Sequence, residues 1–177
     1  LDDEWPTQDG KVLFSDNFET DTSADWRVLF AANNLVDDVT VGFAHDYVSR
    51  DAIPPAPNGS WLGLKLTVNK LDSQPYGAAG VSIYPKDRTF AGNYALRFDM
   101  FIQVNTVAAT TEHATFGVNH SGSKVNWVRQ TAGNVRNPAV DADGLWFAVV
   151  ADASEANLLG HVLYTGDGPA ASAKAIA

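Results

Sequence analysis

One segment constrains the fold of this chain more than any other: the run of residues 94–104, in which apolar and other side chains alternate. Its apolar positions are Tyr94, Leu96, Phe98, Met100, Ile102 and Val104. In a strand all of these side chains share one face, whereas a helix would scatter them around its axis. Full burial would stabilise the fold by about 1.5–3 kcal/mol for each side chain. The segment therefore predicts a long β-strand whose apolar face covers a core.

Shorter strand-like segments lie on both sides of it, at 11–14, 26–32, 39–43, 62–68, 80–84, 114–118, 145–151 and 161–165. The near-continuous apolar run at 145–151 is typical of a central strand covered on both faces. Prolines predict a loop at 51–60, and 151–159 is the only segment that favours even a short helix. Many short strands separated by Gly, Pro and Asp predict an all-β, antiparallel sandwich or barrel.

Composition limits the classes of function. The chain has 177 residues, enough for one domain with a sizeable core, and a net charge of -9 with a pI near 4.6. An acidic surface argues against nucleic acid and against anionic membranes. No apolar run reaches the length of a membrane span, so we expect no membrane insertion.

The remaining composition points to an exported bacterial protein. The acids are almost all Asp, which favours turns, caps and cation sites over helix surfaces. The chain has no cysteine, whereas secreted animal domains of this size often carry disulfides. It begins with Leu1, which is consistent with removal of a signal peptide. We therefore expect a secreted or cell-surface location.

Four segments resemble the strands of concanavalin A-like and laminin-G-like jelly rolls in bacterial exported proteins. They are 14–19 with the nearby Trp26, 92–100, 115–122 and 143–148, within a likeness that covers about 11–164. The resemblance implies an antiparallel jelly-roll β-sandwich over 11–177, after an extended lead-in at 1–10. Such domains commonly bind polysaccharide, and some carry a structural calcium ion.

No catalytic motif is recognisable. Laminarinase-like enzymes of this fold carry E-x-D-x-x-E on one strand, and this pattern is absent, as are G-x-S-x-G and H-E-x-x-H. Asp99 lies on the predicted central strand, where an ion pair with Arg97 on the same face, or with a cross-strand partner, is favoured over acid catalysis. Asp141 and Asp143 precede Gly144 and are typical of a turn.

The preferred binding site surrounds the Gly/Ser turn at 121–123. Glycan modules combine flat aromatic rings with amide and charged side chains, and the candidates here are Asn119, His120, Asn126, Trp127, Arg129 and Trp146. Core or rim packing is the alternative for each Trp, including Trp61 after the proline loop. Calcium is predicted at the turn that holds Asp16, Asn17 and Glu19, where capping of the turn without a metal is the alternative.

Three functions follow from these observations. The first is a non-catalytic carbohydrate-binding or adhesion module, lectin-like, with a polysaccharide or glycan as partner. The second is a structural subunit of an extracellular layer, sheath or filament that self-associates, and the third is a polysaccharide-cleaving enzyme with Asp99 as the first suspect. Because 168–177 has no strand-like pattern, we expect the sandwich to be incomplete and the polypeptide to continue past Ala177, into more of this fold or further domains.

Overall fold

The computed structural model describes residues 11–30, 39–68, 70, 80–103, 113–125, 143–150, 161–165 and 174–176. Within these ranges the chain is mostly β-structure, with one short α-helix and one 3-10 turn. The strands are β1 Trp26–Phe30, β2 Thr40–Asp46, β3 Leu62–Thr67, β4 Val81–Pro85, β5 His113–Val118, β6 Leu145–Val150, β7 His161–Thr165 and β8 Lys174–Ile176. The helix α1 is Tyr47–Asp51, and the 3-10 turn η1 is Ser23–Asp25.

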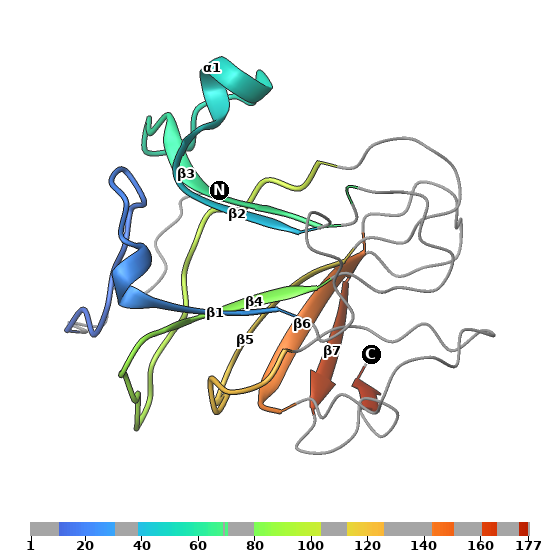
Figure 1. Ribbon diagram of the computed structural model, residues 1–177. Helices are drawn as coiled ribbons and strands as arrows, with labels where there is room; N and C mark the ends of the chain where they lie inside the picture. Colours follow the sequence, from blue (N-terminus) through green and yellow to red (C-terminus); the bar gives the residue numbers. More distant parts are fainter. Residues whose placement is uncertain are drawn as a thin grey trace, which may run out of the picture.

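All strands in these ranges pair antiparallel, in three sheets (Figure 1). β1 pairs with β4, β2 pairs with β3, and a four-stranded sheet has the order β5-β6-β7-β8. Figure 1 shows α1 at one end of the β2–β3 pair, where it follows β2 directly. The predicted antiparallel β-rich fold is confirmed, whereas the described ranges do not show a sandwich or a jelly roll.

Most of the predicted strands are present, and the differences have physical causes. Residues 11–14 and 94–103 form no strand in the structure, although both were predicted to. Tyr94 nevertheless contacts Asn119, and Phe98 contacts Phe116. The order of these contacts is antiparallel to β5, and they are made by side chains, without the backbone hydrogen bonds of a strand pair. Alternation reveals which side chains could share a face, but a ladder also needs a backbone edge in register.

Two short elements were missed. Residues 168–177 were expected to hold no strand, but β8 pairs with β7 through Leu163 opposite Ile176. The helix α1 was also not predicted; it begins at Asp46, whose side chain accepts a hydrogen bond from Ser49 N at 2.8 Å. A one-turn helix carries no periodic pattern, so only its cap residue marks it in the sequence. The loop predicted at 51–60 is confirmed for 52–60, since Asp51 ends the helix, and the helix suggested at 151–159 lies outside the described residues.

Aromatic side chains before β1 connect the β1–β4 pair with the β2–β3 pair. The ring of Trp26 lies 5.3 Å from that of Phe14 and 5.4 Å from that of Phe18, centroid to centroid. Phe18 also lies 6.1 Å from Phe43 of β2. Rings at these separations attract one another beyond their buried area, so this cluster ties the segment 11–18 to two sheets.

The two most deeply buried apolar residues of the described core lie on one face of β6. Trp146 and Ala148 are 1% and 0% exposed, whereas Phe147, on the opposite face, is 39% exposed. The strand is central in its sheet, as predicted, but the expectation that both faces are covered is wrong for Phe147. The described helix is too short to span a membrane.

Gly117 tests how tightly this core face is packed. A Cβ there would collide with the Leu145 carbonyl oxygen and lie 2.6 Å from Trp146 Cβ. We expect Gly117→Ala to lower the free energy of unfolding by about 1–3 kcal/mol, because backbone atoms must move. Gly42→Ala is the control, since its Cβ would meet only His45 Cβ at 3.9 Å. Urea unfolding measures both, and equal stabilities would contradict this packing.

Candidate functional site

The structure brings together only part of the predicted glycan site. Asn119 and His120 follow β5 directly and lie in the described turn 119–125. Trp146 packs in the core with 1% of its surface exposed, and a buried ring offers no face to a sugar. Asn126, Trp127 and Arg129 lie outside the described residues. The candidate site is therefore built from Asn119 and the residues that hold its turn.

His120 is held by a buried carboxylate from the start of the next described segment. Asp143, 8% exposed, lies 3.3 Å from Nδ1 of His120 through Oδ1 and accepts a hydrogen bond of 3.0 Å from Ser121 N through Oδ2. The imidazole fits because Gly117 and Gly144 have no side chains; a Cβ on either would lie 2.7 Å from a ring nitrogen. Gly144 also has a φ of +83°, which disfavours any other residue.

The surroundings of this pair keep Asp143 ionised. Burial opposes its charge, but the hydrogen bonds from Ser121 and His120 outweigh burial and lower the pKa of Asp143 below its ordinary value of 3.8. Tyr84 packs on His120 with ring centroids 5.8 Å apart. Burial, with a smaller effect of the Asp143 charge, raises the pKa of Tyr84, so its hydroxyl stays protonated and donates to Lys124 O at 2.6 Å.

The turn is also docked on the β1–β4 pair. Besides the bond from Tyr84 of β4, Arg27 of β1 donates from Nη1 to Gly122 O at 3.2 Å. Arg27 extends further to Asp87, 3.9 Å away, in an exposed ion pair. Contacts from two strands therefore fix the position of the turn, which sets where Asn119 lies relative to β5.

Tyr94 joins Asn119 to a segment that also contributes one ring to a row of aromatic side chains. Asn119 accepts a hydrogen bond of 3.0 Å through Oδ1 from the Tyr94 hydroxyl, and its φ of 61° is one that asparagine tolerates. Phe98 packs edge-on against Phe116 at 5.0 Å, and Phe116 stacks on Phe147 at 5.5 Å with an interplanar angle of 16°. We call Phe98, Phe116 and Phe147 the aromatic row; Phe98 and Phe147 are 48% and 39% exposed.

The turn predicted to bind calcium is organised by hydrogen bonds. Asp16 accepts from Thr22 Oγ1 at 2.6 Å, from Trp26 Nε1 at 2.7 Å and from Phe18 N at 2.8 Å. Asn17 Oδ1 accepts from Glu19 N at 3.2 Å. The described residues contain no group of three metal-ligating side chains. These contacts fit a turn that caps itself, since both Asp16 oxygens face donors; calcium binding stays a prediction.

Several residues of the site were not singled out from the sequence. Asp143 looked like a turn residue, and its approach to His120 joins positions far apart in the chain. The sequence placed Phe98 in the alternating segment and Phe116 and Phe147 in strand-like runs, but it did not indicate that the three rings meet. No ion pair joins Asp99 to Arg97 in the part of the chain that the structure describes, so the predicted pairing of these two is not formed there.

Comparison with known proteins adds no assignment. No protein-family model, curated protein or solved structure matches the chain. The resemblance to concanavalin A-like domains therefore stays a prediction drawn from the strand pattern.

Asp143→Asn tests the role of the buried carboxylate. Its lowered pKa means that the charged form stabilises the fold above the ordinary value of 3.8, and that this stabilisation is lost as pH falls through the lowered pKa. We expect the variant to lose about 1.5–3 kcal/mol at pH 7, as for hydrogen bonds to a charged group. The difference from wild type should shrink in acid. Asp87→Asn, at a side chain 79% exposed, is the control in urea unfolding across pH.

Proposed function

We propose that this chain is a non-catalytic carbohydrate-binding or adhesion module of a secreted or cell-surface bacterial protein. On this proposal its β-sheets belong to a concanavalin A-like jelly roll, and a glycan binds along the aromatic row beside Asn119. The observation that carries the proposal is that one segment, 94–98, contributes a ring to the row and also contacts Asn119. Phe98 packs on Phe116, and Tyr94 binds Asn119.

The chemistry of this surface suits a sugar. A pyranose has an apolar face of C–H groups, which packs on aromatic rings, and a rim of hydroxyls that donate and accept hydrogen bonds. Phe98 and Phe147 are half-exposed and available for stacking, and Asn119 is exposed. The Tyr94 hydroxyl uses Asn119 Oδ1, so the Asn119 amide NH₂ remains a candidate donor to a ligand.

Further support comes from the state of the buried carboxylate in this region. The buried carboxylate of this region, Asp143, is kept ionised by hydrogen bonds, and a proton donor for glycoside hydrolysis needs a raised pKa. Asp143 is also committed to Ser121 and His120. Its contacts therefore favour positioning of the turn over catalysis.

A second candidate function, a self-associating structural subunit, is favoured by a separate observation. Large apolar side chains of the segment 94–103 are exposed: Leu96 by 51%, Met100 by 46% and Phe101 by 60%. Exposed apolar side chains close together on a surface mark contact sites in other proteins. In a layer or filament these side chains would be subunit contacts.

Binding to soluble polysaccharides tests the first candidate. We expect wild type to be retarded in gels that contain its glycan, and Phe147→Ala to weaken binding about tenfold, because truncating an aromatic anchor removes roughly 1.4 kcal/mol or more. Asn119→Asp keeps the acceptor for Tyr94 and the tolerated φ but removes the NH₂ donor, so it should also weaken binding. Phe101→Ala, outside the row, is the control. Binding that survives both site variants unchanged would place the glycan elsewhere.

Oligomeric state tests the second candidate. If the exposed side chains of 94–103 form subunit contacts, wild type is larger than a monomer by light scattering, and a Met100→Lys, Phe101→Lys double variant is monomeric. Calcium and a chelator are compared in the same runs, because divalent cations bridge acidic surfaces. A wild type that is monomeric under all these conditions rules out assembly through this segment.

A further inference from the structure

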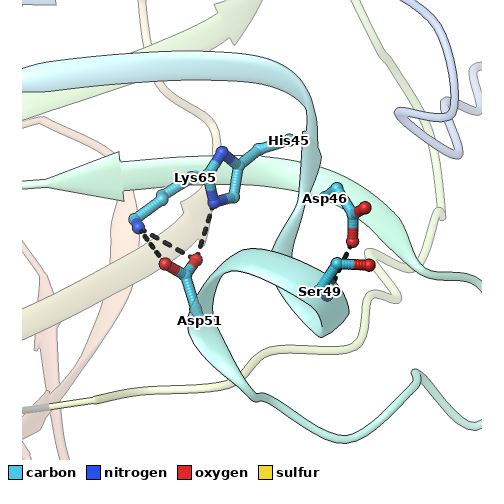
Figure 2. Close-up of polar contacts among 5 residues, drawn as sticks. All are labelled: His45, Asp46, Ser49, Asp51 and Lys65. Atoms are coloured by element: carbon cyan, nitrogen blue, oxygen red, sulfur yellow. Dashed lines mark hydrogen bonds and ion pairs between the residues drawn. The ribbon is translucent and has the colours of Figure 1, made fainter.

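A second cluster of polar side chains lies where α1 meets the β2–β3 pair. Figure 2 shows His45 of β2 and Lys65 of β3 pointing at the carboxylate of Asp51, the last residue of α1. His45 Nε2 lies 2.6 Å from one oxygen of Asp51, and Lys65 Nζ lies 2.8 and 2.9 Å from the two oxygens. The hydrogen bond from Lys65, and then that from His45, lower the pKa of Asp51, which keeps the carboxylate charged at neutral pH.

An exposed tryptophan directly precedes β3. Gly63 and Lys65 alternate onto one face of β3, and continuing this alternation by one residue predicts that Trp61, 54% exposed, lies on the same face. His45 opposes Gly63 in the register, so it shares that face. The ring of Tyr47 covers Gly63, where a Cβ would lie 3.1 Å from the ring. We call Trp61, Tyr47, His45, Asp51 and Lys65 the Trp61 face.

The backbone around this face is held in place by its own contacts. The Tyr47 hydroxyl donates to Ser60 O and accepts from Ala56 N at 3.1 Å, and Tyr47 N donates to Trp61 O at 3.2 Å. A β-bulge between Gly42 and His45 includes Ala44, whose φ is 50°. Bulges re-aim side chains, and here the residue that follows Ala44 is His45. The backbone of Trp61 and the polar cluster are therefore positioned before any ligand arrives, which reduces the entropy lost on binding.

The hydrogen-bonding capacity left on this face indicates the class of ligand. Lys65 has three N–H donors and directs bonds at the two Asp51 oxygens, while its side chain is 42% exposed. A carboxylate has about four acceptor positions, and the bonds from His45 and Lys65 occupy three. The cluster thus retains both a donor and an acceptor. Because Lys65 and Asp51 offset each other's charge, a neutral hydroxyl, which donates and accepts at once, suits the cluster.

We propose that the Trp61 face binds a neutral oligosaccharide, with one pyranose ring stacked on Trp61 and a hydroxyl of a further unit bound between Lys65 and Asp51. Lys65 lies four residues after Trp61, about 13 Å along the chain at the usual strand rise, so the ligand has more than one ring. This inference rests on glycan binding as the proposed function. It adds a face that shares no residue with the aromatic row.

Trp61 variants separate this face from the aromatic row. Wild type, Trp61→Ala and Trp61→Phe are compared with Phe147→Ala by calorimetry, with soluble neutral glucans and with alginate as the acidic polysaccharide. We expect Trp61→Ala to bind a neutral glucan about tenfold more weakly, and Trp61→Phe to keep most of the affinity because a ring remains. Leu66→Ala is the matched control, since Leu66 is 43% exposed and alternates onto the opposite face of β3.

Fluorescence gives a readout of the Trp61 indole itself. Iodide quenches exposed indoles, so wild type should lose more fluorescence than Trp61→Phe, and a bound glucan should remove that difference. Wild-type affinity in Trp61→Ala, with loss of binding in Phe147→Ala, overturns this inference and leaves the proposed function standing. If wild type binds alginate but no neutral glucan, and added salt abolishes that binding, the proposal of a neutral ligand is wrong. If wild type binds none of these polysaccharides, the proposed function and this inference both fail.

Discussion

Much of the described structure depends on the packing of the His120 ring between Gly117 and Gly144. The ring occupies space that any side chain at Gly117 or Gly144 would take, and Asp143 holds it from the side. The same carboxylate binds Ser121 N, so it fixes both the ring and the backbone of the turn. An ionised carboxylate this well buried is stable only because its hydrogen bonds replace water.

The turn in its fixed position connects two sheets. Gly122 and Lys124 offer their carbonyls to Arg27 and Tyr84, which belong to the β1–β4 pair, while β5 leads directly into the turn from the four-stranded sheet. Asn119 is at its start and meets Tyr94 from a segment that forms no strand. The buried contact between Asp143 and His120 therefore helps to position the exposed amide of Asn119, because both lie on the same fixed turn.

The two proposed binding faces arise from different physical situations. On β6 the strand alternation buries Trp146 on one side and leaves Phe147 half-exposed on the other, so the aromatic row is the uncovered side of a core strand. Before β3 the exposed ring is Trp61, which follows a loop that is hydrogen-bonded to Tyr47. Nearby, Asp51 of α1 joins His45 of β2 to Lys65 of β3. If both faces bind, one polymer chain engaging both would gain affinity through effective concentration.

Local sequence pattern accounts for much of the β-structure. Period-two alternation and apolar runs correspond to β1 to β7, and the prolines after Asp51 mark a loop, because strand geometry and proline geometry act within a few residues. The pattern failed at 94–103, where an apolar alternation forms no ladder, and at β8, which has too few residues for a pattern. Asn119 and His120 were chosen from residue type beside a Gly/Ser turn and stay a prediction, whereas Trp146 follows the alternative of core packing, since the same sequence suits a core or a surface.

What the sequence by itself determined is the class of structure, antiparallel and β-rich, and the positions of most strands. Tertiary structure alone decided which groups meet: Asp143 with His120, Asp51 with Lys65, and Phe98 with Phe116. It also decided which aromatic rings face solvent, with Trp61 half-exposed and Trp146 enclosed. The reason is range: strand propensity is a property of neighbouring residues, whereas a hydrogen bond or a ring contact depends on chain segments that only the fold brings within a few ångströms.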